Sequence, residues 1–332
     1  MTRAAGDESP SEPRRIHLLR PQNQLGDLLL NVPAIRAIRA RFPRARITLV
    51  AGRQNALAVQ GQPWVDEVRV VDTRNALGVL GDSLRPGPRP DLAIYFTTVS
   101  YSKSGAYRTR ATRARERVGF DPARYGERDR AGLTRALPYP ERAVHQSEIS
   151  LVLARAVGAT ADPPPPPTYL PDPKLLDRAP RGVAYLHPGA GKVKNRWPAE
   201  RFGVVARELI ARGLDVLWIE GPQDEGCVEA AGRALGTTLP VVRGESIPML
   251  AARFAAARVY VGNDTGPLHL AAATGCPSVG IYGWSDPREW APVGRLVRTV
   301  RAEDHTLESI PPAQVLDQVL PLLEEEPCAL GR

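Results

Sequence analysis

The sequence predicts an α/β protein with two doubly wound domains that face one another across a cleft. Short apolar segments alternate with amphipathic helical segments in both halves of the 332 residues, which is typical of parallel sheets covered by helices on both faces. A proline-rich stretch at 162–180 lies between the halves. Because proline fixes φ and removes backbone donors, this stretch predicts a linker with neither a helix nor a central strand.

These observations divide the chain into five expected parts. They are a disordered tail (1–14), a first domain (15–161), the linker (162–180), a second domain (181–310) and a C-terminal helix with its tail (311–332).

The first domain opens on an apolar strand at 16–20. A glycine turn follows, and then a helix at 27–41, in which Leu28, Val32 and Ile35 recur at helical spacing. Further continuous apolar stretches predict strands buried on both faces, at 46–51, 67–71 and 91–96.

The alternation restarts after the linker. Strands are predicted at 182–187, 215–220, 239–243, 258–262 and 278–282. Helices are predicted at 199–212, 225–235, 247–256, 266–274 and 312–323. Ligands bind at the carboxyl ends of strands in such sheets, so polar residues that directly follow a strand are the candidates for a site.

The net charge of +8 suits an anionic substrate or a nucleic acid. Only four of the 44 basic residues are lysines, and the arginines are scattered apart from a cluster at 108–117. For this cluster a solvated helix face is slightly favoured over an anion-binding surface. The chain has no recognisable nucleic-acid module or aromatic platform, so a nucleic-acid partner is not expected.

The sequence shows neither a membrane helix nor a signal peptide, which predicts a cytoplasmic protein. No stretch approaches the ~18 apolar residues of a membrane helix, and the first fifteen residues lack the apolar core of a signal peptide. Cys227, Cys276 and Cys328 form neither a metal-binding spacing nor a disulfide framework.

Gly26 and Asp27 directly follow the first predicted strand. Asp27 begins the predicted helix, where a carboxylate can cap the free amides of the first turn. A carboxylate at the floor of the cleft can equally accept a proton from a substrate hydroxyl. The spacing leaves both interpretations open.

A second candidate site follows the strand that ends near residue 262. Asp264, Thr265 and Gly266 form a turn that opens on a helix, and a helix N-terminus offers free N–H groups and a positive dipole end to a phosphate. A structural cap would need neither Asp264 nor His269, so a functional role is favoured here. A histidine alone in such a place is more often packed than catalytic.

The loop at 187–198 is rich in glycine and carries three cations, among them Lys194 and Arg196. It matches neither the P-loop nor the dinucleotide-binding fingerprint. Cations on a glycine loop suit a diphosphate leaving group, and this interpretation is favoured over a solvated basic loop. Gly189 and Ala190 are included with these two cations as expected substrate-binding residues.

The segment at 221–225 follows another predicted strand and contains Asp224 and Glu225. A carboxylate in this place commonly holds the hydroxyls of a ribose. Capping of the next helix by Asp224 explains the pattern equally well.

Taken in order, these pieces resemble glycosyltransferase family 9, the ADP-heptose:lipopolysaccharide heptosyltransferase group. The resemblance runs from residue 15 to about 325, and the Asp-Thr-Gly-Pro-x-His stretch with its alanines is its specific part. The segment at 283–287 is similar to the family pattern G-x-[TS]-x-P. The other matching residues are Gly26, Asp27, Pro33, Phe42, Pro43, Trp197, Pro198, 221–225, Asp264, Thr265, Gly266, His269, Pro277 and Pro292.

The resemblance implies a GT-B architecture, with the nucleotide-sugar donor on the C-terminal domain and the acceptor on the N-terminal one. It also implies an inverting transfer that needs neither a metal nor a cofactor besides the nucleotide sugar. Asp27 would be the general base, and Glu225 would hold the ribose. Lys194 and Arg196 would neutralise the diphosphate, and Asp264 with the turn at 265–266 would hold sugar hydroxyls and phosphate.

The sequence departs from the family at one position of this loop. The family usually has a lysine two residues before the tryptophan, and Asn195 stands there in this chain. Lys194 lies one place earlier and Arg196 one place later, so a small adjustment of the loop would restore the charge, because lysine has a flexible stem.

The sequence therefore predicts a transferase that moves a sugar, expected to be heptose from ADP-heptose, to a cell-envelope glycan or glycolipid. An anionic lipid acceptor would bring the 108–117 region into peripheral contact with the inner face of the membrane. One alternative is a GT-B nucleotide-sugar epimerase. The other is a catalytically silent nucleotide-sugar-binding protein, which the departure at Asn195 leaves open.

Overall fold

The computed structural model describes residues 12–71, 88–99, 101–127, 130, 132–141, 145–160 and 168–325. Most of the predicted tail at 1–14, the first part of the linker at 162–167, Cys328 and the C-terminal tail beyond residue 325 lie outside the described residues. The chain divides into two compact units. The first comprises Met1–Asn23, Ala34–Pro140 and Leu151–Asp162, and the second Gln24–Pro33, Glu141–Ser150 and Pro163–Arg332.

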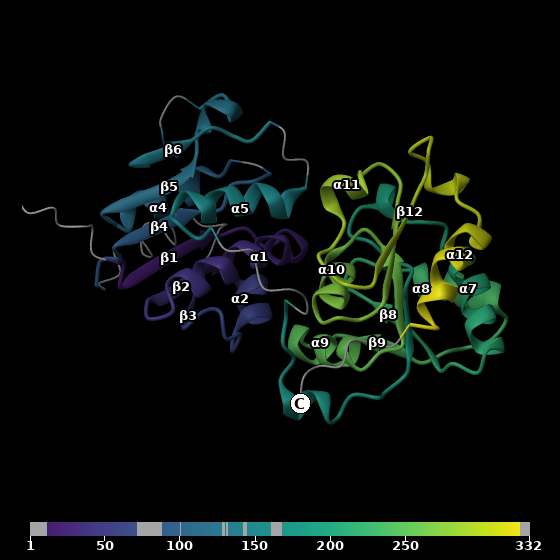
Figure 1. Cartoon of the computed structure of the whole chain (residues 1–332). Coiled ribbons are helices and arrows are strands. Elements are labelled where there is room, and N and C mark those ends of the chain that lie inside the picture. The colour runs from purple at the N-terminus through teal and green to yellow at the C-terminus, as the bar shows by residue number, and fades with distance from the viewer. Residues whose placement is uncertain are drawn as a thin grey trace, which may run out of the picture. The chain divides into compact units, whose positions relative to one another are not determined.

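The first unit is built on a parallel sheet, which among the described residues has six strands in the order β3-β2-β1-β4-β5-β6 (Figure 1). These strands are β1 (Arg15–Arg20), β2 (Arg46–Gly52), β3 (Glu67–Val71), β4 (Leu92–Tyr95), β5 (Glu116–Phe120) and β6 (Arg135–Leu137). The helices nearest to them in sequence are α1 (Leu25–Arg41), α2 (Arg53–Val59), α4 (Lys103–Ala111) and α5 (Gln146–Ala156).

The second unit repeats this plan, with six described strands in the order β12-β11-β10-β7-β8-β9, all parallel. The strands are β7 (Ala184–His187), β8 (Val216–Glu220), β9 (Val241–Arg243), β10 (Val259–Asn263), β11 (Ser278–Tyr282) and β12 (Val297–Arg301). The helices are α6 (Pro173–Leu176), α7 (Ala199–Ala211), α8 (Cys227–Leu235), α9 (Ile247–Ala255), α10 (Gly266–Ala273), α11 (Pro287–Trp290) and α12 (Pro312–Leu322).

The prediction of two doubly wound α/β sheets is confirmed. In both sheets the first strand of the unit lies in the centre, and the order reverses beside it, between β1 and β4 and between β7 and β10. The carboxyl ends at such a switch point are where α/β sheets bind ligands. The fold therefore places the ends of β7 and β10 at the position where a ligand of the second unit would be expected.

The core of the second unit holds this switch point in place. The strands β7, β10 and β11 are buried along their whole length. Trp218 of β8, Phe202 of α7, Val228 of α8 and Val315 of α12 belong to one hydrophobic core. Figure 1 shows these three helices on the same side of the sheet. At Gly203 a side chain would come within 2.6 Å of the backbone oxygen of Ala231, so the contact between α7 and α8 requires glycine at this position. Such tight packing gives the strand ends a fixed geometry.

The expectation of a solvated helix face at 108–117 is wrong in part. Helix α4 ends at Ala111, and Arg113 takes a left-handed conformation with φ 52°. Arg108 is buried, while Arg117 lies on β5 and donates to the carbonyl oxygens of Ala114 and Gly132. The chain turns after α4 to enter the next strand, so the arginines cannot share one helix face.

The expectation of no helix at 162–180 is also wrong, because one helical turn, α6, lies in this stretch. Helix α6 begins at Pro173, with the Asp172 carboxylate accepting a hydrogen bond from the amide of Lys174 at 2.8 Å. Proline is tolerated in the first turn of a helix because its missing N–H would have no partner there. The described part of the stretch is also anchored, since the amides of Thr168 and Tyr169 donate to the carbonyl of Ala273.

A buried histidine on β1 predicts a pH dependence of stability. Burial, assisted by the charge of Arg69, lowers the pKa of His17 from 6.5 to about 4. Between these values the unfolded chain binds a proton at His17 and the folded protein does not. The stability of the folded protein that depends on neutral His17 is therefore complete above pH 6.5 and is lost as the pH falls toward 4. We expect the free energy of unfolding to drop by about 3 kcal/mol over this range because of His17.

Urea unfolding at several pH values between 7 and 4 tests this expectation. The variant His17→Asn should show a correspondingly flatter pH dependence, because asparagine does not titrate. The same slope in both proteins would contradict the assignment.

Candidate functional site

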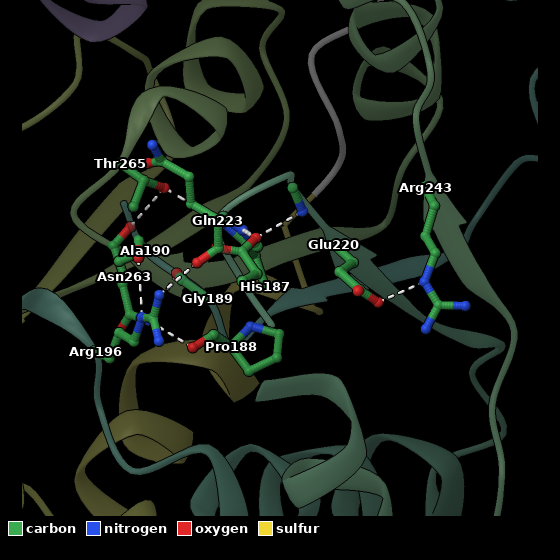
Figure 2. Close-up of polar contacts among 12 residues, drawn as sticks. His187, Pro188, Gly189, Ala190, Arg196, Glu220, Gln223, Arg243, Asn263 and Thr265 are labelled. Carbon is green, nitrogen blue, oxygen red and sulfur yellow. Dashed lines mark hydrogen bonds and ion pairs between the residues drawn. The ribbon is translucent and has the colours of Figure 1, made fainter. Parts of the chain in front are cut away.

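The candidate site of the second unit lies at the carboxyl ends of β7, β8, β10 and β11. The loops that follow these strands are the glycine-rich loop at 188–198, the segment at 221–226, the turn at 264–265 and the segment at 283–286. Side chains buried beneath the loops join them to one another (Figure 2). The described residues of the chain contain no cluster of His, Cys, Asp and Glu that could hold a metal ion.

His187, the last residue of β7, is the centre of the buried contacts. Its Nε2 lies 2.8 Å from Oδ2 of Asp224, and its Nδ1 lies 3.1 Å from the hydroxyl of Tyr260. The same carboxylate oxygen accepts a hydrogen bond from the amide of Gly221 at 2.6 Å. His187 therefore links the end of β7 to the loop after β8 and to β10.

The charge of Asp224 fixes the direction of these hydrogen bonds. Burial opposes ionisation, but the hydrogen bonds from His187 and Gly221 and the charge of Arg196 hold the pKa of Asp224 below its usual value. An ionised carboxylate only accepts, so His187 donates from Nε2 to Asp224, while its Nδ1 lies near the hydroxyls of Tyr260 and Thr265. The expected capping role of Asp224 is wrong, because Gly226 is the N-cap of α8.

Asn263, at the end of β10, holds the glycine-rich loop from below. Its side chain is fully buried, and its Nδ2 donates to the carbonyls of Pro188 and Gly189 at 3.0 Å each. Its Oδ1 accepts from the amide of Trp197 at 3.0 Å. One amide side chain therefore secures both ends of the loop, since its donors and its acceptor are all used.

Arg196 joins the glycine-rich loop to the loop after β8. Its Nε donates to the carbonyl of Ala190 at 2.9 Å, and its Nη2 donates to the carbonyl of Gln223. At Gly189 a Cβ atom would overlap the carboxyl group of Asp224, so glycine is required where the two loops meet. Arg196 thus brings a positive charge to the loop and also determines its shape.

Helix α10 begins beside these loops with the Asp264-Thr265-Gly266 turn. Thr265 is its N-cap residue, and the cap makes no side-chain hydrogen bond. Pro267 has no N–H, and the amides of Leu268 and His269 donate to the carbonyl of Thr265, so Gly266 carries the amide of the first turn that is left for a ligand. Asp264 accepts a hydrogen bond from the hydroxyl of Ser285 at 2.7 Å. Nε2 of the buried His269 lies 3.8 Å from Oδ1 of Asp264.

The start of α1 belongs to the second compact unit and lies beside this turn. A Cβ atom on Gly26 would come within 2.8 Å of the imidazole of His269, so only glycine allows this approach. Helix α1 begins at Leu25. Asp27 therefore lies inside the first turn, and the interpretation of Asp27 as the N-cap is wrong by three residues.

Lys194 and Glu225 are the exposed members of the site. Lys194 lies in a short 3-10 helix, Val193–Asn195, and its Nζ lies 3.7 Å from the centre of the Trp284 ring. Glu225 follows the buried Asp224 and faces solvent. Both side chains are thus accessible to a ligand, in contrast to the buried contacts beneath them.

Comparison with known proteins shows which family the chain belongs to. The family model described as glycosyltransferase family 9 (heptosyltransferase) matches residues 128–314, which is more than half of the chain. The chain belongs to glycosyltransferase family 9. Lipopolysaccharide heptosyltransferase 3 of Escherichia coli is 23% identical to it over 295 residues, or 80% of this chain and 83% of that protein.

Solved structures show the same fold. A family 9 glycosyl transferase from Veillonella parvula DSM 2008 matches with a TM-score of 0.80 at 20% identity, over 94% of this chain and 98% of that one. The E. coli heptosyltransferase WaaC with ADP matches with a TM-score of 0.77 at 19% identity, over 93% and 99% of the two chains. The predicted GT-B fold and the predicted glycosyltransferase class are confirmed.

In this glycosyltransferase most of the predicted site residues follow three neighbouring strands, β10, β7 and β8. These residues are Gly189, Ala190, Lys194, Arg196, Glu225, Asp264, Thr265, Gly266 and His269. Sequence reasoning missed the part played by Asn263, Tyr260 and the His187–Asp224 pair. The available signal was a run of polar residues at the ends of strands that are otherwise apolar, which predicts buried hydrogen bonds.

The anchoring role of the buried Asn263 side chain can be tested by measuring stability. We expect Asn263→Ala to lower the free energy of unfolding by about 2–4 kcal/mol, because three hydrogen bonds are lost and buried partners in the loop remain unsatisfied. Asn195→Ala is the matched control in the same loop and should change stability by less than about 0.5 kcal/mol. Urea denaturation measures both, and equal effects would show that Asn263 does not anchor the loop.

Proposed function

We propose that this glycosyltransferase moves a heptosyl group from ADP-heptose to a lipopolysaccharide precursor or a related cell-envelope glycolipid, with inversion at the anomeric carbon. Family membership supports heptosyl transfer, and the observation that carries the donor assignment is the convergence of Lys194, Arg196 and the α10 N-terminus at the switch point of the second sheet. The similar E. coli enzyme was solved with ADP.

The second unit binds the donor in this proposal. The exposed carboxylate of Glu225 holds the ribose hydroxyls at the end of β8. The diphosphate lies over the ends of β7 and β10, where Lys194 and Arg196 supply positive charge and α10 presents the amide of Gly266 and the positive end of its dipole. Asp264 and His269, whose side chains lie 3.8 Å apart at the start of α10, bind hydroxyls of the sugar.

Asp27 is the general base of the proposed reaction. It takes the proton from the acceptor hydroxyl while the oxygen attacks the anomeric carbon and the bond to the diphosphate breaks. A single displacement of this kind inverts the configuration, and it releases ADP. The approach of Gly26 to His269 supports the role, because it brings the first turn of α1 to the end of the proposed donor site.

Release of ADP on mixing enzyme, ADP-heptose and a heptose-deficient lipopolysaccharide acceptor tests the function. If transfer takes place, ADP and an acceptor product that is heavier by one heptose appear together. Rearranged nucleotide sugar without an acceptor would instead identify an epimerase, and binding of ADP-heptose without either product would identify a silent binding protein.

We propose further that the transfer needs no metal ion. The leaving diphosphate is stabilised by Lys194, Arg196 and the α10 N-terminus, which supply the electrostatic role that a divalent cation has in other transferases. Initial rates should be unchanged in excess EDTA. Loss of activity with EDTA and its recovery with magnesium or manganese would contradict this assignment.

The proposed site of action is the cytoplasmic face of the inner membrane, through peripheral contact. None of the described helices combines the length and apolar character needed to cross a bilayer. The exposed arginines Arg110, Arg113 and Arg115 would meet an anionic lipid surface. Sedimentation with phosphatidylglycerol vesicles at low and high salt tests the contact, and equal binding to neutral vesicles would contradict it.

A further inference from the structure

Trp284 is an exposed aromatic residue at the edge of the donor site, and the proposed function does not use it. Its side chain is 68% exposed. Within the described residues of the second unit, only Val193 is a more exposed large apolar residue, and Val193 precedes Lys194 in the loop. At this exposure most of the ring surface is accessible to a ligand that binds beside the loop.

The backbone on either side of Trp284 is fixed although the ring is exposed. At Gly283 a side chain would come within 2.7 Å of Leu307, so the chain is packed closely there. Ser285 donates to Asp264 at 2.7 Å, and the Asp286 carboxylate accepts from Arg301 at 2.8 Å. The ring is therefore presented from a rigid segment, as a ligand-binding residue requires.

The order of strands places Trp284 at the sugar end of the donor. Along the sheet, Glu225 follows β8, the glycine-rich loop follows β7, the α10 turn follows β10 and Trp284 follows β11. Adjacent strands are about 4.8 Å apart, so these four positions span roughly 14 Å. A nucleotide sugar with its ribose at Glu225 and its diphosphate over β7 and β10 must extend its sugar toward β11.

The position of Lys194 indicates how the ring becomes available. Its ammonium group lies over the Trp284 ring, where an exposed cation–π contact is weak. A diphosphate offers the same ammonium charge-assisted hydrogen bonds, which are stronger. When Lys194 turns to the diphosphate, the face of the indole is open to a sugar ring.

We propose that Trp284 stacks on the sugar ring of the donor, after Lys194 has moved from the indole to the diphosphate, and that it thereby determines which glycosyl group binds. The inference rests on the proposed function.

Calorimetric titration of the full chain with ADP and with ADP-heptose tests the stacking. Trp284→Ala should bind ADP like the unaltered protein and bind ADP-heptose about 3- to 10-fold more weakly, the range of one aromatic contact. Trp284→Phe should recover most of the loss, because it keeps a ring. Trp290→Phe, on the neighbouring α11, is the matched control and should leave both affinities unchanged.

The outcomes separate this inference from the proposed function. Equal weakening of ADP and ADP-heptose in Trp284→Ala would place the ring at the nucleotide and overturn the stacking, as would no change in either. Failure of the unaltered, folded protein to bind ADP-heptose would instead reject the proposed donor and the inference that rests on it.

Indole fluorescence tests the movement of Lys194. Saturating ADP should change the emission of the unaltered protein and of Trp290→Phe, because the cation leaves the Trp284 ring. The change should be absent in Trp284→Phe and reduced in Lys194→Met. The same change in all four proteins would assign it to another tryptophan, and either that result or no change in the unaltered protein would contradict the movement of Lys194.

Discussion

Replacing Asp27 with asparagine is expected to lower the rate of glycosyl transfer by about 10²–10⁴-fold, the usual contribution of a general base. Asparagine has nearly the same shape but cannot take a proton from the acceptor hydroxyl. Asp27 lies inside the first turn of α1, after the N-cap position, so the substitution does not replace the N-cap residue. Loss of the favourable charge near the helix N-terminus should change stability by less than about 1 kcal/mol.

Three measurements separate the catalytic role from a structural one. The melting temperature and the affinity for ADP should be unchanged in Asp27→Asn, while ADP release with donor and acceptor should fall. Asp27→Glu is the control that retains a carboxylate and should recover part of the rate. Transfer at nearly the original rate by Asp27→Asn would exclude Asp27 as the base.

Removal of the charge at Lys194 is expected to reduce turnover by about 10²–10³-fold, because the charge that develops on the leaving diphosphate loses its partner. Lys194 is exposed, and its described contact is the Trp284 ring, so Lys194→Met should not change the free energy of unfolding measurably. Steady-state kinetics and urea denaturation of the same preparations give the two quantities.

Arg196 provides the contrast to Lys194. Arg196→Met should reduce turnover and also lower stability, because the hydrogen bonds to Ala190 and Gln223 join two loops. If Lys194→Met loses stability as much as Arg196→Met does, the two cations share a structural role. If Lys194→Met turns over normally, the donor diphosphate does not meet Lys194.

Sequence reasoning predicted long or strongly apolar elements and missed short ones. The strands at the centre of both sheets and the helices α1, α7, α9 and α12 were predicted within a few residues of their bounds. The elements α2, β5, β6, α11 and β12 were not predicted, because each is short or rich in charged residues and has no clear hydrophobic period. Sheet contacts over long distances in sequence stabilise such segments. Helix α5, with 11 residues, was also missed.

The sequence by itself determined the family of this protein, its two α/β domains and the types of residue that a diphosphate site needs. Strand–helix alternation and turn chemistry are local, so they can be recognised without a structure. Which polar side chains would be buried and paired depended on strand order. Only the tertiary structure brought Asn263 beneath the glycine-rich loop, paired His187 with Asp224 and placed Lys194 over Trp284, because these contacts join strand ends that are adjacent in the sheet and distant in the chain.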